Sequence, residues 1–232
     1  MIKMQHKTLD PRLSLAYDLY DSCELAADIG TDHAHLPAAL LQRGRCQHMI
    51  LTDISESALD NARNEIIRRN LTERVSLRLG DGLTPVEEKC GMISIMGMGG
   101  RTIRDILLSG REHLRGASLL LSAHTDWHLI RSAVQEIGYH LDREDPCFSS
   151  GRYYLVLRAR PGSGALSDQE IRLGGPLFSS ASPVLYAFVQ RRRDVLQKHL
   201  CGIRSSAVPD ESEIRLLEKD LLFYNRFLSS GK

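Results

Sequence analysis

The segment that most constrains the fold spans residues 25–37, LAADIGTDHAHLP. An apolar run leads into a turn that contains Asp28 and Gly30, and the start of a helix follows. The next apolar run, residues 49–52, ends at Asp53. This order predicts the first βαβ unit of a sheet that binds a nucleotide or nucleoside. In it, Gly30 lets the backbone turn sharply and approach a ligand, and Asp53 accepts hydrogen bonds from ribose hydroxyls.

The chemistry of this turn argues against a dinucleotide. A G-x-G-x-x-G fingerprint needs further glycines after Gly30, where Asp32 and Ala34 stand instead. Asp28 and Asp32 would repel a pyrophosphate, which prefers free backbone N–H groups. Carboxylates suit a ligand with positive charge and no phosphate, such as S-adenosyl-L-methionine. An ordinary Asp-Gly turn in another α/β protein is the alternative at this point.

Two later strand ends favour the same ligand. The apolar run at residues 75–79 ends in Gly80-Asp81-Gly82, and the run at 92–96 ends in Gly97-Met98-Gly99-Gly100. An acidic residue after the third strand is where methyltransferase-like sheets hold the adenine amino group. Ligands of open α/β sheets bind at the carboxyl ends of the strands, so four such ends with Gly or Asp loops predict one continuous site.

These motifs together resemble a known family. ADIGTDHAHLP, GDGL and GMGG, in this order and preceded by LDPRL at residues 9–13, resemble the TrmK-type bacterial tRNA (adenine-22-N1)-methyltransferases. The resemblance covers residues 9–160. It implies an α/β fold, with a Rossmann-like class I methyltransferase sheet in residues 1–160 and a C-terminal antiparallel helical coiled-coil domain in residues 161–232. It also implies methylation of N1 of an adenine in the D-arm of tRNA, with S-adenosyl-L-methionine as the cofactor.

The site residues follow from the strand ends and the resemblance. Asp32 is the candidate catalytic residue, because a carboxylate near N1 or N6 would stabilise the charge of a methylated adenine. Its alternative role is the N-cap of the following helix. Arg12, Gly99 and Gly100 are expected at the target nucleotide; the alternatives are a surface ion pair for Arg12 and a tight turn for the glycines. The expected cofactor-binding residues are Asp28, Gly30, Asp32, His33, Asp53, Ile54, Asp81, Gly82, Gly97 and Met98.

One loop departs from the family pattern. After the fifth strand the family often has a Gln-Pro-Asn-like segment, whereas residues 122–126 read SAHTD here. Since this loop borders the expected target-base pocket, the departure concerns the target base and not the cofactor.

The remaining periodicity predicts the rest of the fold. Ser55 is the expected N-cap of one helix, and Gly138 ends another. The segments around Asp145-Pro146 and residues 149–151 are expected to join two final strands into a hairpin that closes the sheet. The expected helices span residues 34–42, 55–70, 102–108 and 127–137, and the last three strands span residues 117–122, 139–144 and 153–160.

The C-terminal region reads as a linker and two helices. Residues 161–176, rich in Gly, Ser and Pro, predict the linker. Residues 182–205 and 210–228 carry apolar stripes and predict an antiparallel helical pair. This pair either grips the tRNA elbow or braces the catalytic domain.

Composition narrows the function classes without deciding among them. The chain has 232 residues, 42% hydrophobic and 25% charged, with a net charge of +1, which is typical of a globular protein. Its five scattered cysteines suggest reduced thiols of a cytoplasmic protein, and no apolar run is long enough for a membrane span. We expect a monomer whose partner is tRNA. Three basic clusters, at residues 68–69, 111–115 and 191–193, either track phosphates or form solvated helix faces.

Histidine spacing raises the question of a metal. His33 and His35 resemble half of a dinuclear hydrolase motif, but the matching Asp-His pair does not follow. His124 and His128 lack the Glu of an H-E-x-x-H helix. We therefore expect no metal. The alternatives to a tRNA methyltransferase are methylation of another RNA site, a protein or a small molecule, a non-catalytic module that binds S-adenosyl-L-methionine, and a metal hydrolase.

Overall fold

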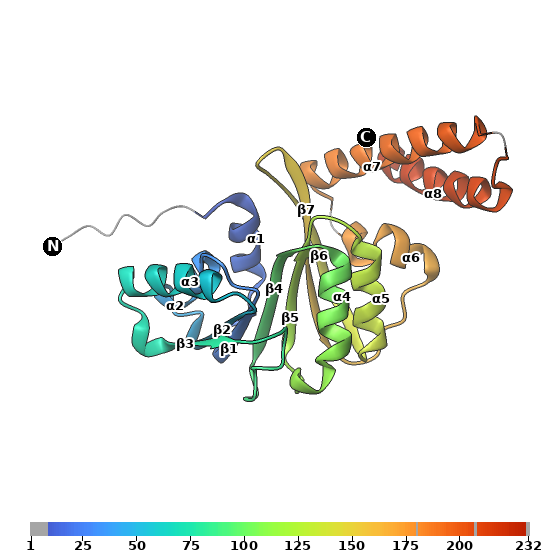
Figure 1. Cartoon of the computed structure of the whole chain (residues 1–232). Coiled ribbons are helices and arrows are strands. Elements are labelled where there is room, and N and C mark those ends of the chain that lie inside the picture. The colour runs from blue at the N-terminus through green and yellow to red at the C-terminus, as the bar shows by residue number, and fades with distance from the viewer. Residues whose placement is uncertain (1–8, 180, 207, 231–232) are drawn as a thin grey trace.

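The computed structural model describes residues 9–179, 181–206 and 208–230, and its centre is a seven-stranded sheet in the order β3-β2-β1-β4-β5-β7-β6 (Figure 1). Strands β1 to β5 are parallel, and β7 pairs antiparallel with both β5 and β6. The expected parallel sheet with a closing hairpin is thus confirmed. The strands are β1 (Cys23–Ile29), β2 (Cys46–Asp53), β3 (Val75–Leu79), β4 (Met92–Met98), β5 (Ser118–Ala123), β6 (Tyr139–Ser149) and β7 (Arg152–Pro161).

Helices cover both faces of the sheet. On one face, α1, α2 and α3 pack in a core with Met49, Leu51 and Leu120, and on the other, α4 and α5 pack with Leu119 and Leu121 (Figure 1). The helices are α1 (Pro11–Leu19), α2 (His35–Gln42), α3 (Glu56–Arg68), α4 (Gly100–Ser109), α5 (Trp127–Glu136), α6 (Asp168–Leu173), α7 (Pro183–Arg204) and α8 (Glu211–Ser230), with short 3₁₀ turns η1 (Thr72–Arg74), η2 (Arg111–His113) and η3 (Pro176–Ser179).

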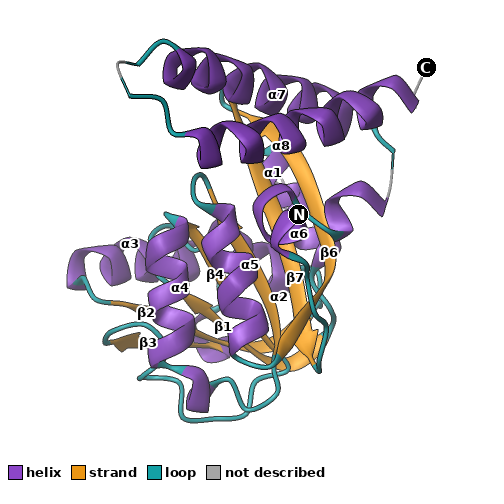
Figure 2. Cartoon of the chain, turned by 90° about the vertical axis from the view of Figure 1, so that its right-hand side faces the viewer, coloured by secondary structure: helices purple, strands orange, loops and turns teal. Residues whose placement is uncertain are grey.

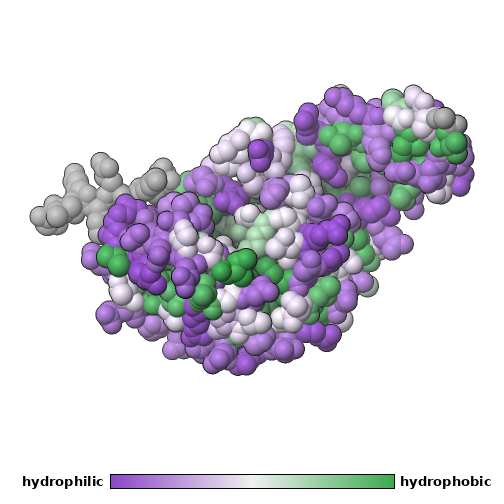
Figure 3. All heavy atoms as spheres, in the orientation of Figure 1, coloured by the Kyte–Doolittle hydropathy of each residue, from purple (hydrophilic) through white to green (hydrophobic). Residues whose placement is uncertain are grey.

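The strand order creates a crevice at β1. Chain order runs outward from β1 through β2 to β3 and then resumes on the other side with β4. The loops after β1 and β4 therefore leave the sheet toward opposite faces. Such a switch point is where ligands bind in open α/β sheets. The face seen in Figure 3 is mostly hydrophilic and is hollowed near its centre.

Local signals explain most helix starts. Ser55 accepts a hydrogen bond from the backbone of Ala58 and caps α3, as predicted. Asp10 caps α1, which the sequence reading did not assign as a helix, through the backbone N–H groups of Arg12 and Leu13. Helix α4 begins at Gly100, two residues before the predicted start.

The expected break at Asp145-Pro146 is wrong. Both residues lie within β6, which continues to Ser149 and pairs with β7 along its length. Pro146 fits because β6 is an edge strand, where a missing N–H donor need not face a neighbour. The turn is confined to Ser150 and Gly151, both with positive φ, as two-residue hairpins favour.

The expected linker at residues 161–176 is also wrong in part. Residues 168–173 form α6, which begins with a reciprocal capping box between Ser167 and Glu170. Its Leu173 is buried in the main core, and Arg131 of α5 donates hydrogen bonds to the backbone carbonyls of Ile171 and Arg172. This segment is therefore packed against the sheet domain.

Helices α7 and α8 form an antiparallel pair across the end of the long β6 and β7 strands (Figure 2). Near the sheet, Phe188 and Tyr224 join the main core, whereas Leu200 and Leu217 belong to a separate small cluster farther out. The predicted apolar stripes thus pack against the sheet domain near one end of the pair and against each other farther out. None of the helices in the described part of the chain is long and apolar enough to cross a membrane.

Candidate active site

The larger of two adjoining cavities lies at the ends of β1 and β4. It has a volume of about 290 Å³. Arg12 of α1 reaches it from one side, and residues 30–37 and 96–98 form much of its wall. The sequence-predicted residues that line it are Arg12, Asp28, Gly30, Asp32, His33, Gly97 and Met98.

The second cavity lies at the ends of β2 and β3 and measures about 120 Å³. Gly30 and Met98 border both cavities, so the two adjoin. The predicted residues Asp53, Ile54, Asp81 and Gly82 line this smaller cavity. The structure therefore brings together all ten expected cofactor-binding residues, although they come from four separate strand ends.

Gly30 is required by the geometry between the cavities. Its φ is +72°, and a Cβ at this position would lie 1.8 Å from Cε of Met98. The backbone N–H groups of Gly30 and Thr31 both bond to the carbonyl of Thr52, which ties the turn to β2. A side chain here would have to adopt a disfavoured backbone conformation and displace Met98.

The smaller cavity offers the hydrogen-bond acceptors and the apolar surface that a nucleoside requires. One carboxylate oxygen of Asp53 accepts a hydrogen bond from the backbone of Ser55 at 2.9 Å, which fixes the side chain and leaves the second oxygen for a ligand. The side chain of Ile54 is 73% exposed, an uncovered apolar surface on which a planar base can lie. Asp81, also exposed, can accept a hydrogen bond from an amino group.

Asp28 occupies a very different environment. It is buried at the end of β1 and accepts a hydrogen bond from Oγ of Ser94 at 2.5 Å. Burial raises the pKa of Asp28 to about 6, although hydrogen bonds from Ser94 and Thr31 and the charge of Arg12 oppose the rise. Asp28 is therefore held inside the wall of the larger cavity by fixed polar partners.

Asp32 lies at the rim of the larger cavity, with 57% of its side chain exposed. It accepts a hydrogen bond from Nδ2 of Asn61 at 3.0 Å and lies 3.2 Å from Nε2 of His33. The alternative role as a helix cap is wrong, because Ala34 is the N-cap of α2 and its helix start has no side-chain cap. The carboxylate of Asp32 is thus oriented by α3 and faces the site.

Arg12 and Gly97 reach the larger cavity, whereas Gly99 and Gly100 do not. The guanidinium of Arg12 lies over the ring of Tyr154, 5.3 Å from its centroid, and a Cβ on Gly97 would lie 3.8 Å from its Nη1. Gly99 and Gly100 lie outside the lining of both cavities. Gly100 is buried, and a Cβ there would lie 2.4 Å from the carbonyl oxygen of Asp126, so close packing of two loops accounts for this glycine.

A third cavity, of about 300 Å³, lies beyond those two loops. His124 and His128 line it together with Trp127 and Arg192. Sequence reasoning missed this arrangement, because Arg192 comes from α7 and the other three residues from the loop after β5 and the start of α5. Within residues 9–179, 181–206 and 208–230, no three His, Cys, Asp or Glu side chains converge as metal ligands.

Comparison with known proteins identifies the family. A family model described as a methyltransferase domain matches residues 9–157. The tRNA (adenine(22)-N(1))-methyltransferase of Bacillus subtilis (strain 168) is 30% identical over 161 residues, which are 68% of this chain and 68% of that protein. The chain belongs to this methyltransferase family. The predicted resemblance to TrmK-type enzymes is thereby confirmed.

Solved structures of the family share the whole architecture. Streptococcus pneumoniae Sp1610, to which a tRNA (m1A22) methyltransferase activity is ascribed, is 27% identical, and the match covers 95% of this chain and 100% of that one with a TM-score of 0.86. A second structure of Sp1610 contains S-adenosyl-L-methionine and matches with a TM-score of 0.82. The crystal structure of B. subtilis TrmK, at 24% identity and a TM-score of 0.83, has the same fold over 95% of this chain and 99% of that one.

Proposed function

We propose that this protein transfers a methyl group from S-adenosyl-L-methionine to N1 of the adenine at position 22 of tRNA. The observation that carries the proposal is the pair of adjoining cavities across four strand ends, with Asp53 and Asp81 in one and Asp28 and Asp32 in the other. This is the shape and charge that an elongated, cationic nucleoside derivative requires.

The chain's residues fit the cofactor part by part. Asp53 accepts hydrogen bonds from the ribose hydroxyls, Ile54 covers one face of the adenine, and Asp81 accepts a bond from its amino group. Gly30 lets the backbone lie close to the ligand where the cavities meet. Asp28, fixed by Ser94, supplies negative charge toward the ligand's positively charged methionine part. Bound in this way, the cofactor supplies a methyl group on its sulfonium.

Asp32 acts on the target base. When N1 of adenine gains the methyl group, positive charge develops on the ring and is shared with the exocyclic amine. A carboxylate oriented beside that position stabilises the charge and can accept a proton from N6. Asn61 orients Asp32 for this role, and Arg12, which lines the same cavity, binds the target nucleotide. The bond from methyl carbon to sulfur breaks as the bond to N1 forms, so the residues contribute position and charge.

We further propose that the two parts of the chain have different roles. Residues 1–160, of which 1–8 lie outside the described part of the chain, form the methyltransferase domain. The α7–α8 pair is a C-terminal antiparallel coiled-coil domain that contributes to tRNA binding. Gly97 lines the pocket of the target base, whereas Gly99 and Gly100 lie outside both cavities and Gly100 allows the loop after β4 to pack against Asp126. The protein acts as a monomer, in the cytoplasm with its tRNA substrate and without a resident metal ion.

The test is methyl transfer from labelled S-adenosyl-L-methionine to unmodified bacterial tRNA, followed by digestion and nucleoside identification. The proposal predicts N1-methyladenosine as the labelled product. Asp32→Ala and Asp32→Asn should lower kcat by about 100-fold, in the range typical of lost acid–base or electrostatic assistance. Because Asp32 also lines the cofactor cavity, both variants should bind S-adenosyl-L-homocysteine more weakly but still measurably in calorimetric titrations, and kcat is therefore compared at saturating cofactor. Cofactor binding without labelled RNA would contradict the proposal.

A further inference from the structure

A second groove lies outside the cofactor site, between the catalytic sheet and the α7–α8 pair. It consists of two cavities of about 300 and 450 Å³ that share Trp127 and Arg192. Its walls come from the loop after β5, the tip of the β6–β7 hairpin and the first half of α7. Because these segments are distant in sequence, no linear motif marks the groove.

A row of aromatic rings runs along this groove. Phe148 and Tyr153 pair across β6 and β7 with ring centroids 4.9 Å apart. Tyr153 contacts Phe188 of α7 at 5.7 Å, and Phe188 contacts Trp127 at 5.6 Å. The guanidinium of Arg192 lies 5.3 Å above the Trp127 ring. Phe148, at the open end, is 50% exposed and therefore available to stack on a ligand.

The charge of the groove is strongly positive. Among the described residues that line its two cavities, Asp126 is the single carboxylate, against five arginines. Two of these arginines have ionic partners in the fold, since Arg131 pairs with Glu144 and Arg172 with Asp220. The other three are Arg152, Arg191 and Arg192, of which Arg152 and Arg191 are exposed.

The loop that lines the groove contacts the loop that borders the active site. Its floor includes Thr125 and Asp126, and the backbone N–H of Gly100 donates to the carbonyl of Thr125 at 3.2 Å. Gly100 directly follows the Gly97–Gly99 segment at the end of β4, whose first residues line the larger cofactor cavity. An RNA strand with its target nucleotide in the larger cavity would therefore reach the groove with the nucleotides next to the target.

We propose that this groove binds an unpaired stretch of the RNA substrate next to the target adenine, with phosphates on Arg152 and Arg191 and a base stacked on Phe148. Alternating cations and aromatic rings are the features by which proteins hold single-stranded nucleic acid. The proposal rests on the proposed function and deepens it. It also supplies the surface that offsets the lost stacking when the target base leaves the tRNA fold.

The first test measures electrostatic contact. Arg152→Gln and Arg191→Gln should each weaken tRNA binding and reduce the slope of log affinity against log salt by about 0.7–0.9, the loss of one phosphate contact. Lys89→Gln is the control, because Lys89 is an exposed cation just before the amino-terminal end of β4, at the sheet edge opposite the carboxyl ends of the strands and outside the lining of the groove. Fluorescence anisotropy with labelled tRNA over several salt concentrations gives both quantities.

The second test measures base stacking. Phe148→Leu retains an apolar contact with Tyr153 but lacks a ring, and it should weaken tRNA binding about 5-fold or more, as loss of one stacked base does. Ile67→Ala on α3 is the control, since Ile67 is 53% exposed and lies outside the lining of the groove. Calorimetric titration with S-adenosyl-L-homocysteine should give unchanged affinity for every variant, which shows that the fold and the cofactor site are intact.

The outcomes separate the two proposals. If the wild type neither binds nor methylates tRNA, the proposed function fails. If the wild type methylates tRNA but the three groove variants match both controls in affinity and salt slope, the groove proposal is overturned while the function stands. A shallower slope for the arginine variants and weaker binding for Phe148→Leu support the groove proposal.

Discussion

Asp28 and Asp53 stand at the ends of neighbouring strands, yet their surroundings give them different tasks. Asp28 is buried and bonded to Ser94, and burial raises its pKa to about 6. Asp53 is partly exposed and has one oxygen tied to the backbone of Ser55. The carboxylate of Asp28 is therefore held in the wall of the larger cavity, whereas Asp53 lines the smaller cavity with part of its side chain exposed.

The environment of Asp28 predicts a specific pH dependence of stability. Its folded pKa of about 6 exceeds its ordinary value of 3.8, so the folded protein binds this proton more tightly than the unfolded chain. The resulting stabilisation is present below pH 3.8 and is lost as the pH rises through about 6. The loss is about 3 kcal/mol, because each pKa unit corresponds to about 1.4 kcal/mol. Urea denaturation gives the free energy of unfolding of the wild type and of Asp28→Asn at several pH values between 4 and 7. The difference between the two free energies should change over this range by the amount stated. A difference that stays constant with pH would contradict the raised pKa of Asp28.

Asp53 should determine cofactor affinity. Asp53→Ala removes a charged acceptor of ribose hydroxyls and should weaken binding of S-adenosyl-L-homocysteine about 10-fold or more, since a hydrogen bond to a charged group contributes about 1.5–3 kcal/mol. Asp53→Asn keeps an acceptor for the backbone of Ser55, so its affinity should lie between those of the wild type and Asp53→Ala. Isothermal titration calorimetry measures the change, with the exposed Glu73→Ala as control. Wild-type affinity in Asp53→Ala would remove Asp53 from the site.

At the scale of elements, the β1–α2 turn determines the geometry of the site. Gly30→Ala places a Cβ within 1.8 Å of Met98 and forces a side chain to a φ of +72°. We expect a loss of stability of about 1–2 kcal/mol from the backbone alone, together with weaker cofactor binding. Adding Met98→Ala should restore only part of the stability, because it relieves the contact and leaves the backbone strain. Thermal unfolding and calorimetric titration of both variants test this; full recovery in the double variant would show that the contact alone matters.

The elements that sequence could predict are those with local signals. The glycine turns, the Ser55 cap and the apolar runs of β1 to β5 each lie within a few residues of chain. Pro146 suggested a break because Pro excludes central strands, but the position of β6 at the sheet edge is a tertiary fact. The Gly- and Ser-rich composition of residues 161–176 likewise concealed α6, whose packing depends on Arg131 from a distant helix.

The residues of the two sites also differ in whether a local sequence signal marks them. Residues on strand ends, such as Gly30, Asp53 and Asp81, were predicted because the carboxyl ends of parallel strands must meet. The groove of Trp127, Phe148 and Arg192 could not be predicted, because its members come from three segments that only the folded hairpin and α7 bring together.

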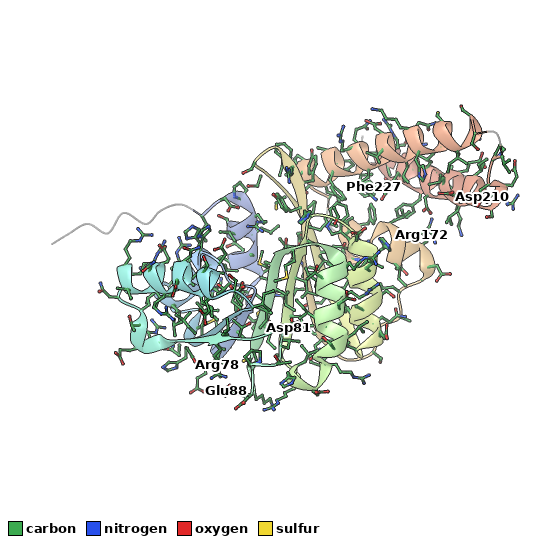
Figure 4. All side chains as sticks on the ribbon, in the orientation of Figure 1. Arg78, Asp81, Glu88, Arg172, Asp210 and Phe227 are labelled. Atoms are coloured by element: carbon green, nitrogen blue, oxygen red, sulfur yellow. The ribbon has the colours of Figure 1, made fainter. Side chains whose placement is uncertain are left out.

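At the scale of the whole molecule, a relay of ion pairs connects the sheet to the C-terminal helices. Arg131 of α5 pairs with Glu144 of β6 and donates to the backbone of α6. Arg172 of α6, which is labelled in Figure 4, pairs with Asp220 of α8. The relay fixes α7 and α8 relative to the catalytic sheet. The groove between them therefore has a defined width.

Loss of the Arg131–Glu144 ion pair should destabilise the fold. Arg131→Met leaves Glu144 buried without its partner and should reduce the free energy of unfolding by about 3–5 kcal/mol, whereas the double variant Arg131→Met/Glu144→Leu should recover much of that loss. Urea denaturation measures both. Equal stability of the Arg131→Met variant and the wild type would show that the pair contributes little to the connection.

The most direct test of the whole account is methyl transfer to two unmodified tRNA transcripts that differ in one nucleotide. One has adenine at position 22 and the other has guanine there, and both are incubated with the wild-type protein and labelled S-adenosyl-L-methionine. The account predicts one N1-methyladenosine per tRNA in the first transcript and none in the second. Equal labelling of both transcripts, or of neither, would contradict it.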